Sequence, residues 1–471
     1  MHTIEQIFIN GEFVTPHGTE WFDLYNPATA QVMGQVRLAD EVDAERAIAA
    51  AKAAFPAWSR TTKQERIAAL KRMHAAVAAR HDDLLEAVIE EYGAPASRSA
   101  WMASYPAEVI AQAIEALEAF EFVTPAGAAT VQMTPLGVAG LITPWNSDAG
   151  FICGKLAAAL AAGCTAVIKP SEMSALQTQI VTEALRDAAL PPGVFNIVTG
   201  RGETVGETLS RHPDVAKISF TGSTNTGKAI LRNAAESFKR VTLELGGKSP
   251  TILLDDVDLE QAIPLVIQAG FMNSGQACVA GTRILVPYSR KAEIETALAQ
   301  AVAAVKSGDP RSSATDVGPM VSEKQWLRVQ GYIRKGIEEG ARLLAGGEGR
   351  PDGTRDGWFV RPTLFADVNN RMTIARDEIF GPVLCVIPYQ DEAEAIAIAN
   401  DTEYGLSAMV LGADVDRARR VAQQIVSGRV LVNTLAHEPK APFGGFKHSG
   451  VGREMGEWGI RAFMEPRSMV G

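Results

Sequence analysis

The sequence is poor in cysteine, and the few that it has are scattered. The four cysteines, Cys153, Cys164, Cys278 and Cys385, form no C-x-x-C pair and have no histidines at metal-ligand spacing. Such a pattern argues against a disulfide scaffold and indicates a reducing compartment, with at most one thiol taking part in chemistry. No metal site is expected.

An excess of positive charge and a long apolar run are also missing. The formal net charge is −10, whereas nucleic acid and anionic membranes attract a basic face. The longest uncharged apolar stretch, residues 156–168, is shorter than the roughly 18 residues of a membrane span. Residues 1–11 have neither region of a secretory signal. We therefore expect a soluble cytoplasmic protein with a small-molecule substrate, no nucleic-acid partner and no membrane partner.

Strands alternate with helices after a mostly helical segment at residues 40–120. Buried strands are predicted at 137–144, 164–170, 194–200, 216–222 and 240–247. This alternation predicts a parallel sheet with crossover helices, which binds ligands beyond the carboxyl ends of its strands. A second α/β series runs from Lys248 to residues 428–434. Since single cores rarely exceed about 250–300 residues, we expect two or more domains, with a cleft near the glycine turn at 246–248.

Two glycine-rich turns are candidates for a phosphate contact. Residues 222–228 fit G-x-x-x-x-G-K, but Ala229 stands where Ser or Thr would hold magnesium, which argues against a triphosphatase. Residues 200–206 resemble G-x-G-x-x-G but are one residue too long, and alone they indicate tight turns. Because a helix follows each turn, backbone N–H groups there suit a phosphate, and we favour this at Gly222–Ser223.

Lys169 and Glu172 follow the end of another predicted strand. A carboxylate at such a place can accept both hydroxyls of a ribose and repel a 2′-phosphate, which favours NAD over NADP. Taken alone, the two residues are more typical of a surface ion pair.

Five segments read together resemble the aldehyde dehydrogenase superfamily. They are TPWN at 143–146, LELGGKSP at 243–250, GQACVAG at 275–281, EIFGPV at 378–383 and PFGGFKHSGVGRE at 442–454. The resemblance covers essentially the whole chain and implies an α/β fold with three parts. These are a Rossmann-like NAD-binding domain (1–120 and 136–246), an α/β catalytic domain (247–445) and a small β oligomerisation element (121–135 and 459–471).

The resemblance gives Cys278 the role of nucleophile. No His, Lys or Arg lies within four positions of it, and a free thiol has a pKa of about 8.5, so its activation has to come from other segments. Asn146 and the backbone N–H of Cys278 would hold the oxyanion, and Glu244 would activate the water that hydrolyses a thioester. Lys155 and Glu465 match positions that pass protons away from the base.

The resemblance also implies the cofactor residues, for NAD with NADP as the alternative. Glu378 would bind the nicotinamide ribose, Phe380 would pack on the cofactor, and Lys169 and Glu172 would hold the adenine ribose. The further residues implied are Trp145, Asn146, Ser171, Gly202, Phe220, Gly222, Ser223, Glu244, Leu245 and Gly246.

The chain departs from the family pattern after Asn146. Many members continue with an aromatic residue and proline, whereas this chain has SDAG at 147–150. We expect a roomy aldehyde channel with a polar mouth, and no arginine can be assigned to it from the sequence. The channel residues predicted are Ser147, Phe151, Gly154, Ala277, Val279, His437 and Glu438. Such a channel favours a bulky or polar aldehyde, such as a semialdehyde or an aryl aldehyde.

The same residues bear on two alternative functions, and the predicted edge strands bear on the assembly state. In a CoA-acylating relative, coenzyme A would resolve the thioester, but a water-activating Glu244 argues against it. A structural or binding protein that kept the fold and lost activity is a further alternative. The presence of Cys278, Asn146, Glu244 and Glu378 together argues against it. An exposed edge strand within 121–137 or 459–471 needs a partner, so a homo-oligomer, a dimer or tetramer, is expected.

Overall fold

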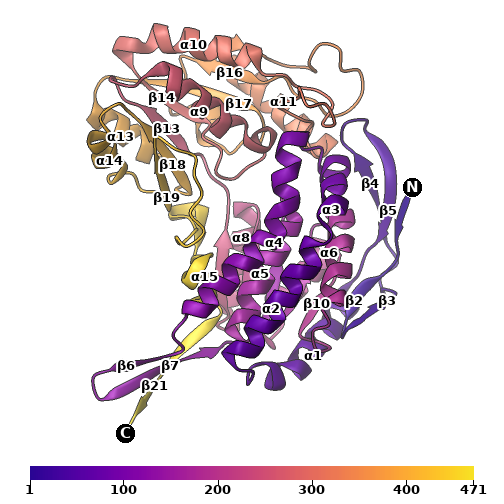
Figure 1. Cartoon of the computed structure of the whole chain (residues 1–471). Coiled ribbons are helices and arrows are strands. Elements are labelled where there is room, and N and C mark those ends of the chain that lie inside the picture. The colour runs from indigo at the N-terminus through magenta and orange to yellow at the C-terminus, as the bar shows by residue number, and fades with distance from the viewer.

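The computed structural model describes residues 1–471 and contains two large sheets and two small ones (Figure 1). The first large sheet has eight strands, in the order β20 (Gly450–Val451), β12 (Arg240–Glu244), β11 (Val215–Thr221), β8 (Val138–Ile142), β9 (Thr165–Lys169), β10 (Phe195–Ile197), β2 (Ile7–Ile9) and β3 (Glu12–Val14). Its five central strands are parallel, and β20, β2 and β3 join antiparallel at the two sides. The predicted α/β fold with a parallel sheet is confirmed.

Helices cover this first sheet. In chain order the helices of the first half are α1 (Glu41–Trp58), α2 (Lys63–Ala78), α3 (His81–Ala87), η1 (Val88–Tyr92), α4 (Ala96–Ala119), α5 (Asp148–Ala162), η2 (Glu172–Ser174), α6 (Ala175–Asp187), η3 (Gly202–Gly206), α7 (Glu207–Arg211) and α8 (Thr224–Ala235). The alanine-rich α5 is almost wholly buried and packs on α4. It ends, as predicted, at Gly163, whose φ of 91° favours glycine.

The second large sheet has seven strands. Their order is β15 (Arg342–Ala345), β16 (Thr363–Ala366), β17 (Val383–Tyr389), β14 (Arg283–Pro287), β13 (Pro250–Leu253), β18 (Ser407–Leu411) and β19 (Arg429–Val432). The helices of this half are α9 (Leu259–Phe271), η4 (Met272–Gly275), η5 (Tyr288–Arg290), α10 (Lys291–Ala304), α11 (Glu323–Glu338), α12 (Thr373–Arg376), α13 (Glu392–Asn400) and α14 (Val415–Ala422). All strands but β15 run parallel.

The edges of the two large sheets position the candidate site. Asn146 follows strand β8, and Glu244 is the last residue of strand β12, so both lie at the carboxyl edge of the first sheet. Cys278 and Glu378 precede strands β14 and β17 of the second sheet, at its amino edge. The chain passes from one edge to the other through residues 245–249, so the two edges meet where the cleft is expected.

Each end of the chain contributes to one of the two small sheets. At the N-terminus, β1 (His2–Ile4), β4 (Trp21–Asn26) and β5 (Gln31–Arg37) form one sheet, which the sequence did not predict. After η6 (Lys447–Ser449) and α15 (Gly456–Arg461), β21 (Met464–Val470) pairs with β7 (Ala129–Pro135), which pairs with β6 (Val123–Ala126). This β6-β7-β21 sheet projects from the body and carries the C-terminus (Figure 1). The helix α15 occupies the start of a tail predicted as strand. No helix in the structure has the length and apolar character to cross a membrane.

Candidate active site

The segment before Cys278 has an unusual backbone. Asn273, Ser274 and Gly275 lie in succession in the left-handed region, with φ values of 51°, 59° and 75°. A Cβ on Gly275 would come within 2.3 Å of the carbonyl oxygen of Gly381, so this close approach requires glycine. Such strained backbone is concentrated at functional sites, where the surrounding structure enforces it.

Buried hydrogen bonds hold this segment. The side chain of Gln276, which is 1% exposed, accepts from the backbone N–H of Val321 at 3.0 Å. Its amide nitrogen donates to the carbonyl of Pro319 at 3.4 Å, and the hydroxyl of Tyr92 donates to the carbonyl of Asn273 at 3.2 Å. The nucleophile candidate therefore stands on a fixed support.

Asn146 reaches this segment from the first sheet. Its side-chain nitrogen donates to the carbonyl oxygen of Gln276 at 3.0 Å, and the residue is 7% exposed. Asp148 fixes the turn that carries Asn146: its fully buried carboxylate accepts from the hydroxyls of Thr143 at 2.6 Å and Thr178 at 2.8 Å. Asp148 was not predicted as a site residue, although an acid in place of the family's proline was visible in the sequence.

The thiol of Cys278 is half-buried and strongly perturbed. Its surroundings raise its pKa to about 12, chiefly through burial and then through the carboxylates of Glu378 and Glu244. The positive charge of Arg429 acts in the opposite direction. Without further help, the thiol is protonated at neutral pH.

Glu244 is a buried carboxylate without a hydrogen-bond partner in the chain. It ends β12, is 3% exposed, and both carboxylate oxygens lack a partner. A Cβ on Gly444 would lie 2.8 Å from one of them. Burial raises the pKa of Glu244 well above its usual value, and the charge of Glu454 adds to the rise, while Lys155 opposes it. Perturbed carboxylates of this kind are typical of proton-transfer sites.

Lys155 and Glu454 form an ion pair beside Glu244. The ammonium of Lys155 lies 2.5 Å from Glu454 and 2.9 Å from the hydroxyl of Ser219, which also donates to Glu454 at 2.8 Å. The charge of Lys155 acts on Glu244, and its part in proton transfer stays a prediction.

The prediction that Glu465 joins this group is wrong in the structure. Glu465 lies on β21, opposite Thr134 of β7, and pairs at 2.7 Å with the exposed Arg240. The projecting sheet holds it away from Lys155, and Glu454 takes the place beside Lys155 instead. The sequence did offer a signal, because Glu454 is the last residue of the segment at 442–454 that carries the family resemblance.

Glu378 lies against the glycines at the junction of the two sheets. Its carboxylate accepts from the backbone N–H of Gly247 at 3.0 Å, and a Cβ on Gly246 would clash with it at 2.5 Å. Burial raises the pKa of Glu378 to about 7. The glycines at 246 and 247 thus allow this close packing.

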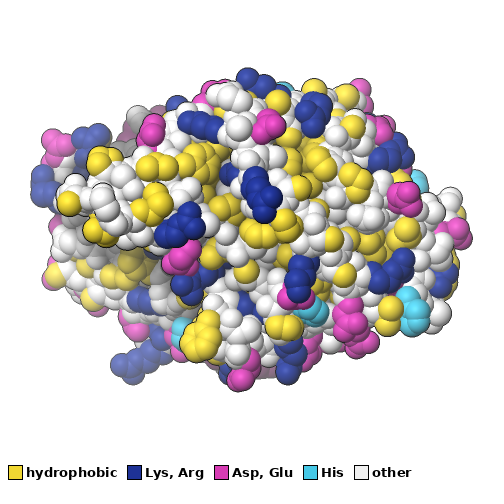
Figure 2. All heavy atoms as spheres, turned by 90° about the horizontal axis from the view of Figure 1, so that it is seen from below, with side chains coloured by type: hydrophobic (Ala, Val, Ile, Leu, Met, Phe, Trp, Pro, Cys, Tyr) yellow, Lys and Arg dark blue, Asp and Glu magenta, His cyan; other side chains and the backbone are white.

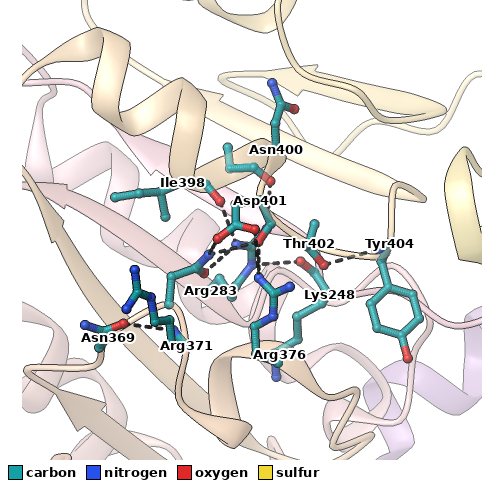
Figure 3. Close-up of polar contacts among 12 residues, drawn as sticks. Lys248, Arg283, Asn369, Arg371, Arg376, Ile398, Asn400, Asp401, Thr402 and Tyr404 are labelled. Atoms are coloured by element: carbon teal, nitrogen blue, oxygen red, sulfur yellow. Dashed lines mark hydrogen bonds and ion pairs between the residues drawn. The ribbon is translucent and has the colours of Figure 1, made fainter.

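A fully buried arginine fixes the segment that follows these glycines. Arg283 donates through Nε to the carbonyl of Lys248 at 3.0 Å and through its terminal nitrogens to the carbonyls of Ile398 and Ala399, at 2.9 and 2.8 Å (Figure 3). It thereby ties the amino edge of the second sheet to the end of α13. Arg283 has a supporting role that the sequence analysis did not identify.

The adenine-ribose candidates form a charged cluster at the end of β9. Lys169 and Glu172 form an ion pair at 3.3 Å that is mostly buried rather than on the surface, and Arg201 adds a second contact to Glu172 at 3.3 Å. Arg201 also pairs with Glu20 at 2.7 Å. These charges together lower the pKa of Glu172, although its burial acts to raise it. Arg201 is a further neighbour of this cluster that the sequence analysis missed.

The other cofactor candidates lie along the same carboxyl edge. Trp145 packs edge-on to Phe380 with ring centroids 5.5 Å apart, so two segments distant in sequence meet. Ser223 caps α8 by accepting from the N–H of Thr226 at 3.3 Å. Phe220 is buried and packs on Gly222, and Leu245 is buried and packs on Gly227. Ser171 caps η2. Nothing lies within 4 Å of a Cβ placed on Gly202.

The channel candidates on α5 leave less room than the sequence alone suggests. A Cβ on Gly150 would lie 2.7 Å from the ring of Tyr105, and one on Gly154 would lie 3.6 Å from Val109. Side chains of α4 therefore take up part of the room that the small residues of α5 leave. Ser147, Phe151 and Val279 are half-buried, Ala277 is buried, and His437 and Glu438 are exposed.

Comparisons with known proteins show which family the chain resembles. Residues 13–469 match the model of the aldehyde dehydrogenase family. The chain is 44% identical over 473 aligned positions to the 3-succinoylsemialdehyde-pyridine dehydrogenase of a Pseudomonas species, covering 100% of this chain and 99% of that protein.

Solved structures agree in fold over the whole chain. A mutant of aldehyde dehydrogenase C from Pseudomonas syringae, complexed with NAD+ and octanal, has a TM-score of 0.98 and 44% identity over 100% of this chain and 97% of that one. An aldehyde dehydrogenase of Mycobacterium tuberculosis complexed with NAD+ has a TM-score of 0.96 and 41% identity, covering 99% and 98%. The chain belongs to the aldehyde dehydrogenase family.

Proposed function

We propose that the protein oxidises an aldehyde to the carboxylic acid with NAD as the hydride acceptor, through a thioester on Cys278 that water hydrolyses. The observation that carries this proposal is the contact of Asn146 with Gln276, which brings an amide donor to the nucleophile's segment. The buried, unpartnered Glu244 supports a base near the same segment.

The chain's residues fit NAD as the cofactor. Lys169 and Glu172 offer a buried ion pair at a strand end, suited to the hydroxyls of a ribose. Glu378 and the edge-on pair of Trp145 and Phe380 would lie beside the nicotinamide half. When bound there, NAD supplies an acceptor for hydride and a positive charge near the thiol. The charge of Glu172 favours NAD, with NADP as the weaker alternative.

The protein groups act in two stages. In the first, the thiol of Cys278 loses its proton to solvent, the thiolate adds to the aldehyde carbon, and the oxyanion that forms accepts from the Asn146 amide and the backbone N–H of Cys278. Loss of hydride from that carbon leaves a thioester on the sulfur. In the second stage Glu244 takes a proton from water, whose oxygen attacks the thioester carbon; the C–S bond breaks and releases the carboxylic acid and the thiolate of Cys278. Lys155 and Glu454 then offer a route for the proton from Glu244.

The absorbance of NADH, followed with a panel of aldehydes and with NAD or NADP, tests the proposal. Wild type should form one NADH per aldehyde oxidised, with the carboxylic acid as product in the absence of coenzyme A. A Cys278→Ser variant should lose nearly all of this activity. Full activity of that variant, or turnover that requires coenzyme A and yields acyl-CoA in place of the carboxylic acid, would reject the mechanism.

We further propose that the protein forms a homo-oligomer, a dimer or tetramer, through the β6-β7-β21 sheet. The strand β6 is exposed along its length and leaves an edge unpaired. Val123 and Val470 on this sheet are 50% and 81% exposed. The end of the molecule that carries the sheet shows hydrophobic side chains between charged ones (Figure 2). Light scattering of the intact chain and of a chain shortened after Ala462 would test the role of β21.

A further inference from the structure

Arg429 lies near Cys278 and has no acidic partner. It opens β19 and is half-buried. Its Nε donates to the hydroxyl of Ser407 at 3.2 Å, and its terminal nitrogens have no hydrogen bond or ion pair within the chain. Arg417, also in the second half of the chain, differs: it contacts the carboxylates of Asp255 and Glu392 at 2.6 and 2.9 Å.

The amino edge of the second sheet brings Arg429 toward Cys278. Arg429 pairs in register with Ser407, at the start of β18. The residue before it, Leu406, would lie 3.4 Å from a Cβ on Gly247, and the carbonyl of Cys278 would lie 2.4 Å from the same point. In agreement with this proximity, the charge of Arg429 acts to lower the pKa of Cys278.

A second uncompensated arginine, Arg98, lies on α4. Its Nε donates to the side chain of Asn273 at 2.6 Å, just before the nucleophile's segment. Its guanidinium stacks on Trp101 at 3.8 Å, and Trp101 stacks on Tyr105 with centroids 4.4 Å apart. Tyr105 in turn contacts Gly150 of α5. The stack therefore runs from Asn273, just before the nucleophile's segment, to α5, and it carries a positive charge.

Two half-buried guanidinium groups without carboxylates indicate a negative charge brought by the ligand. Burying a cation costs free energy unless an anion or hydrogen bonds compensate it. The planar guanidinium matches a carboxylate in a two-point contact. We propose that the channel selects aldehydes that carry a carboxylate at the far end of the molecule, bound by the terminal nitrogens of Arg429, with Arg98 as a second cation. This inference rests on the proposed function and names its substrate class.

Chain-matched pairs of aldehydes test the inference. Succinic semialdehyde is compared with butanal, and glutaric semialdehyde with pentanal, by kcat/KM at saturating NAD. For wild type, kcat/KM should be about tenfold or more higher for the semialdehyde, which carries the carboxylate, than for the neutral aldehyde of at least one pair. An Arg429→Gln variant should lower kcat/KM about 10–100-fold more for that acid than for its neutral partner, mainly through KM. Arg98→Gln should act in the same direction and more weakly.

Two further variants serve as controls. Arg420, exposed on α14, provides the same change of charge, and Arg420→Gln should keep the wild-type ratio of acid to neutral aldehyde. If Arg429→Gln does not fold, Arg429→Lys keeps the charge without the planar fork and should lower the acid preference several-fold.

The outcomes separate this inference from the proposed function. Wild type that shows no acid preference in either pair, or an Arg429→Gln variant that lowers both members of a pair equally, overturns the inference. Oxidation of the neutral aldehydes would still leave the proposed function standing. No NADH from any aldehyde would overturn the proposed function itself.

Discussion

The side-chain amide of Asn146 donates to the backbone carbonyl of Gln276 at 3.0 Å, and this contact links the two large sheets next to Cys278. Asn146 follows a strand of the first sheet, whereas Gln276 precedes a strand of the second. The donor is therefore fixed relative to the sulfur before a substrate arrives. Preorganised donors of this kind lower the barrier because they need little rearrangement when charge develops.

Replacing Asn146 by alanine should lower kcat strongly. Loss of one oxyanion donor typically costs about 10²–10³-fold in kcat. The NADH assay gives kcat, and alkylation of Cys278 by iodoacetamide checks that the thiol is still accessible. A loss of less than tenfold, with the thiol still reactive, would show that Asn146 does not hold the oxyanion.

Replacing Glu244 by glutamine should separate the two stages of the reaction. Glutamine keeps the volume but cannot take a proton from water, so the thioester should accumulate. We expect a burst of about one NADH per active site followed by a steady rate reduced about 10²–10⁴-fold. Stopped-flow absorbance measures both phases. A variant that lost the burst together with the steady rate would place Glu244 in the first stage.

The sequence predicted the fold and the central residues because regular patterns and short motifs carried them. The alternation of strands and helices predicted the parallel sheet, and Gly163 marked the end of α5 correctly. The motifs also predicted which segments meet, since Asn146 and Trp145 do contact residues more than 100 positions away.

The sequence alone does not predict contacts that depend on how the C-terminal segments pack against the rest of the fold. Glu454 and Glu465 are only 11 positions apart (465 − 454), yet one lies beside Lys155 and the other on the projecting sheet. Arg98 and Arg429 carry no motif, and only the packing of α4 and the register of β19 bring them to the site. The short N-terminal strands have too few residues for a clear alternation.

The charges around Glu244 should move the pH profile of kcat in opposite directions. The negative charge of Glu454 raises the pKa of Glu244 and the positive charge of Lys155 lowers it. Glu454→Gln should therefore shift the acid limb of kcat to lower pH, and Lys155→Gln should shift it to higher pH. Glu465→Gln, on the exposed pair with Arg240, should leave it in place. Shifts of the same sign in the first two variants would contradict this electrostatic account.

The thiol of Cys278 should become more reactive when the charge of Glu378 is removed. The carboxylate of Glu378 helps to raise the pKa of Cys278 to about 12, so Glu378→Gln should lower that pKa and increase the thiolate fraction. Rates of alkylation by iodoacetamide at fixed alkaline pH, without NAD, measure this fraction. The exposed Glu323→Gln provides the control. Slower alkylation of Glu378→Gln than of wild type would argue against the assigned cause.

Asp148 should make the stability of the wild type fall as pH rises through the weakly acidic range. Burial raises its pKa from the usual 3.8 to about 7, so the folded state holds a proton that the unfolded state has lost in this interval. The resulting stabilisation is complete below pH 3.8 and is lost as the pH passes 7.

The uncharged Asp148→Asn variant removes this dependence and can keep both contacts, because the hydroxyls of Thr143 and Thr178 can rotate to donate or accept. The free energy of unfolding of wild type relative to the variant should fall by on the order of 3 kcal/mol between about pH 5 and about pH 8, because the folded-state pKa is about 7. Urea unfolding at the two pH values measures it, with the exposed Asp82→Asn as control. An equal difference at both pH values would mean that Asp148 is already ionised in the folded protein at the lower pH.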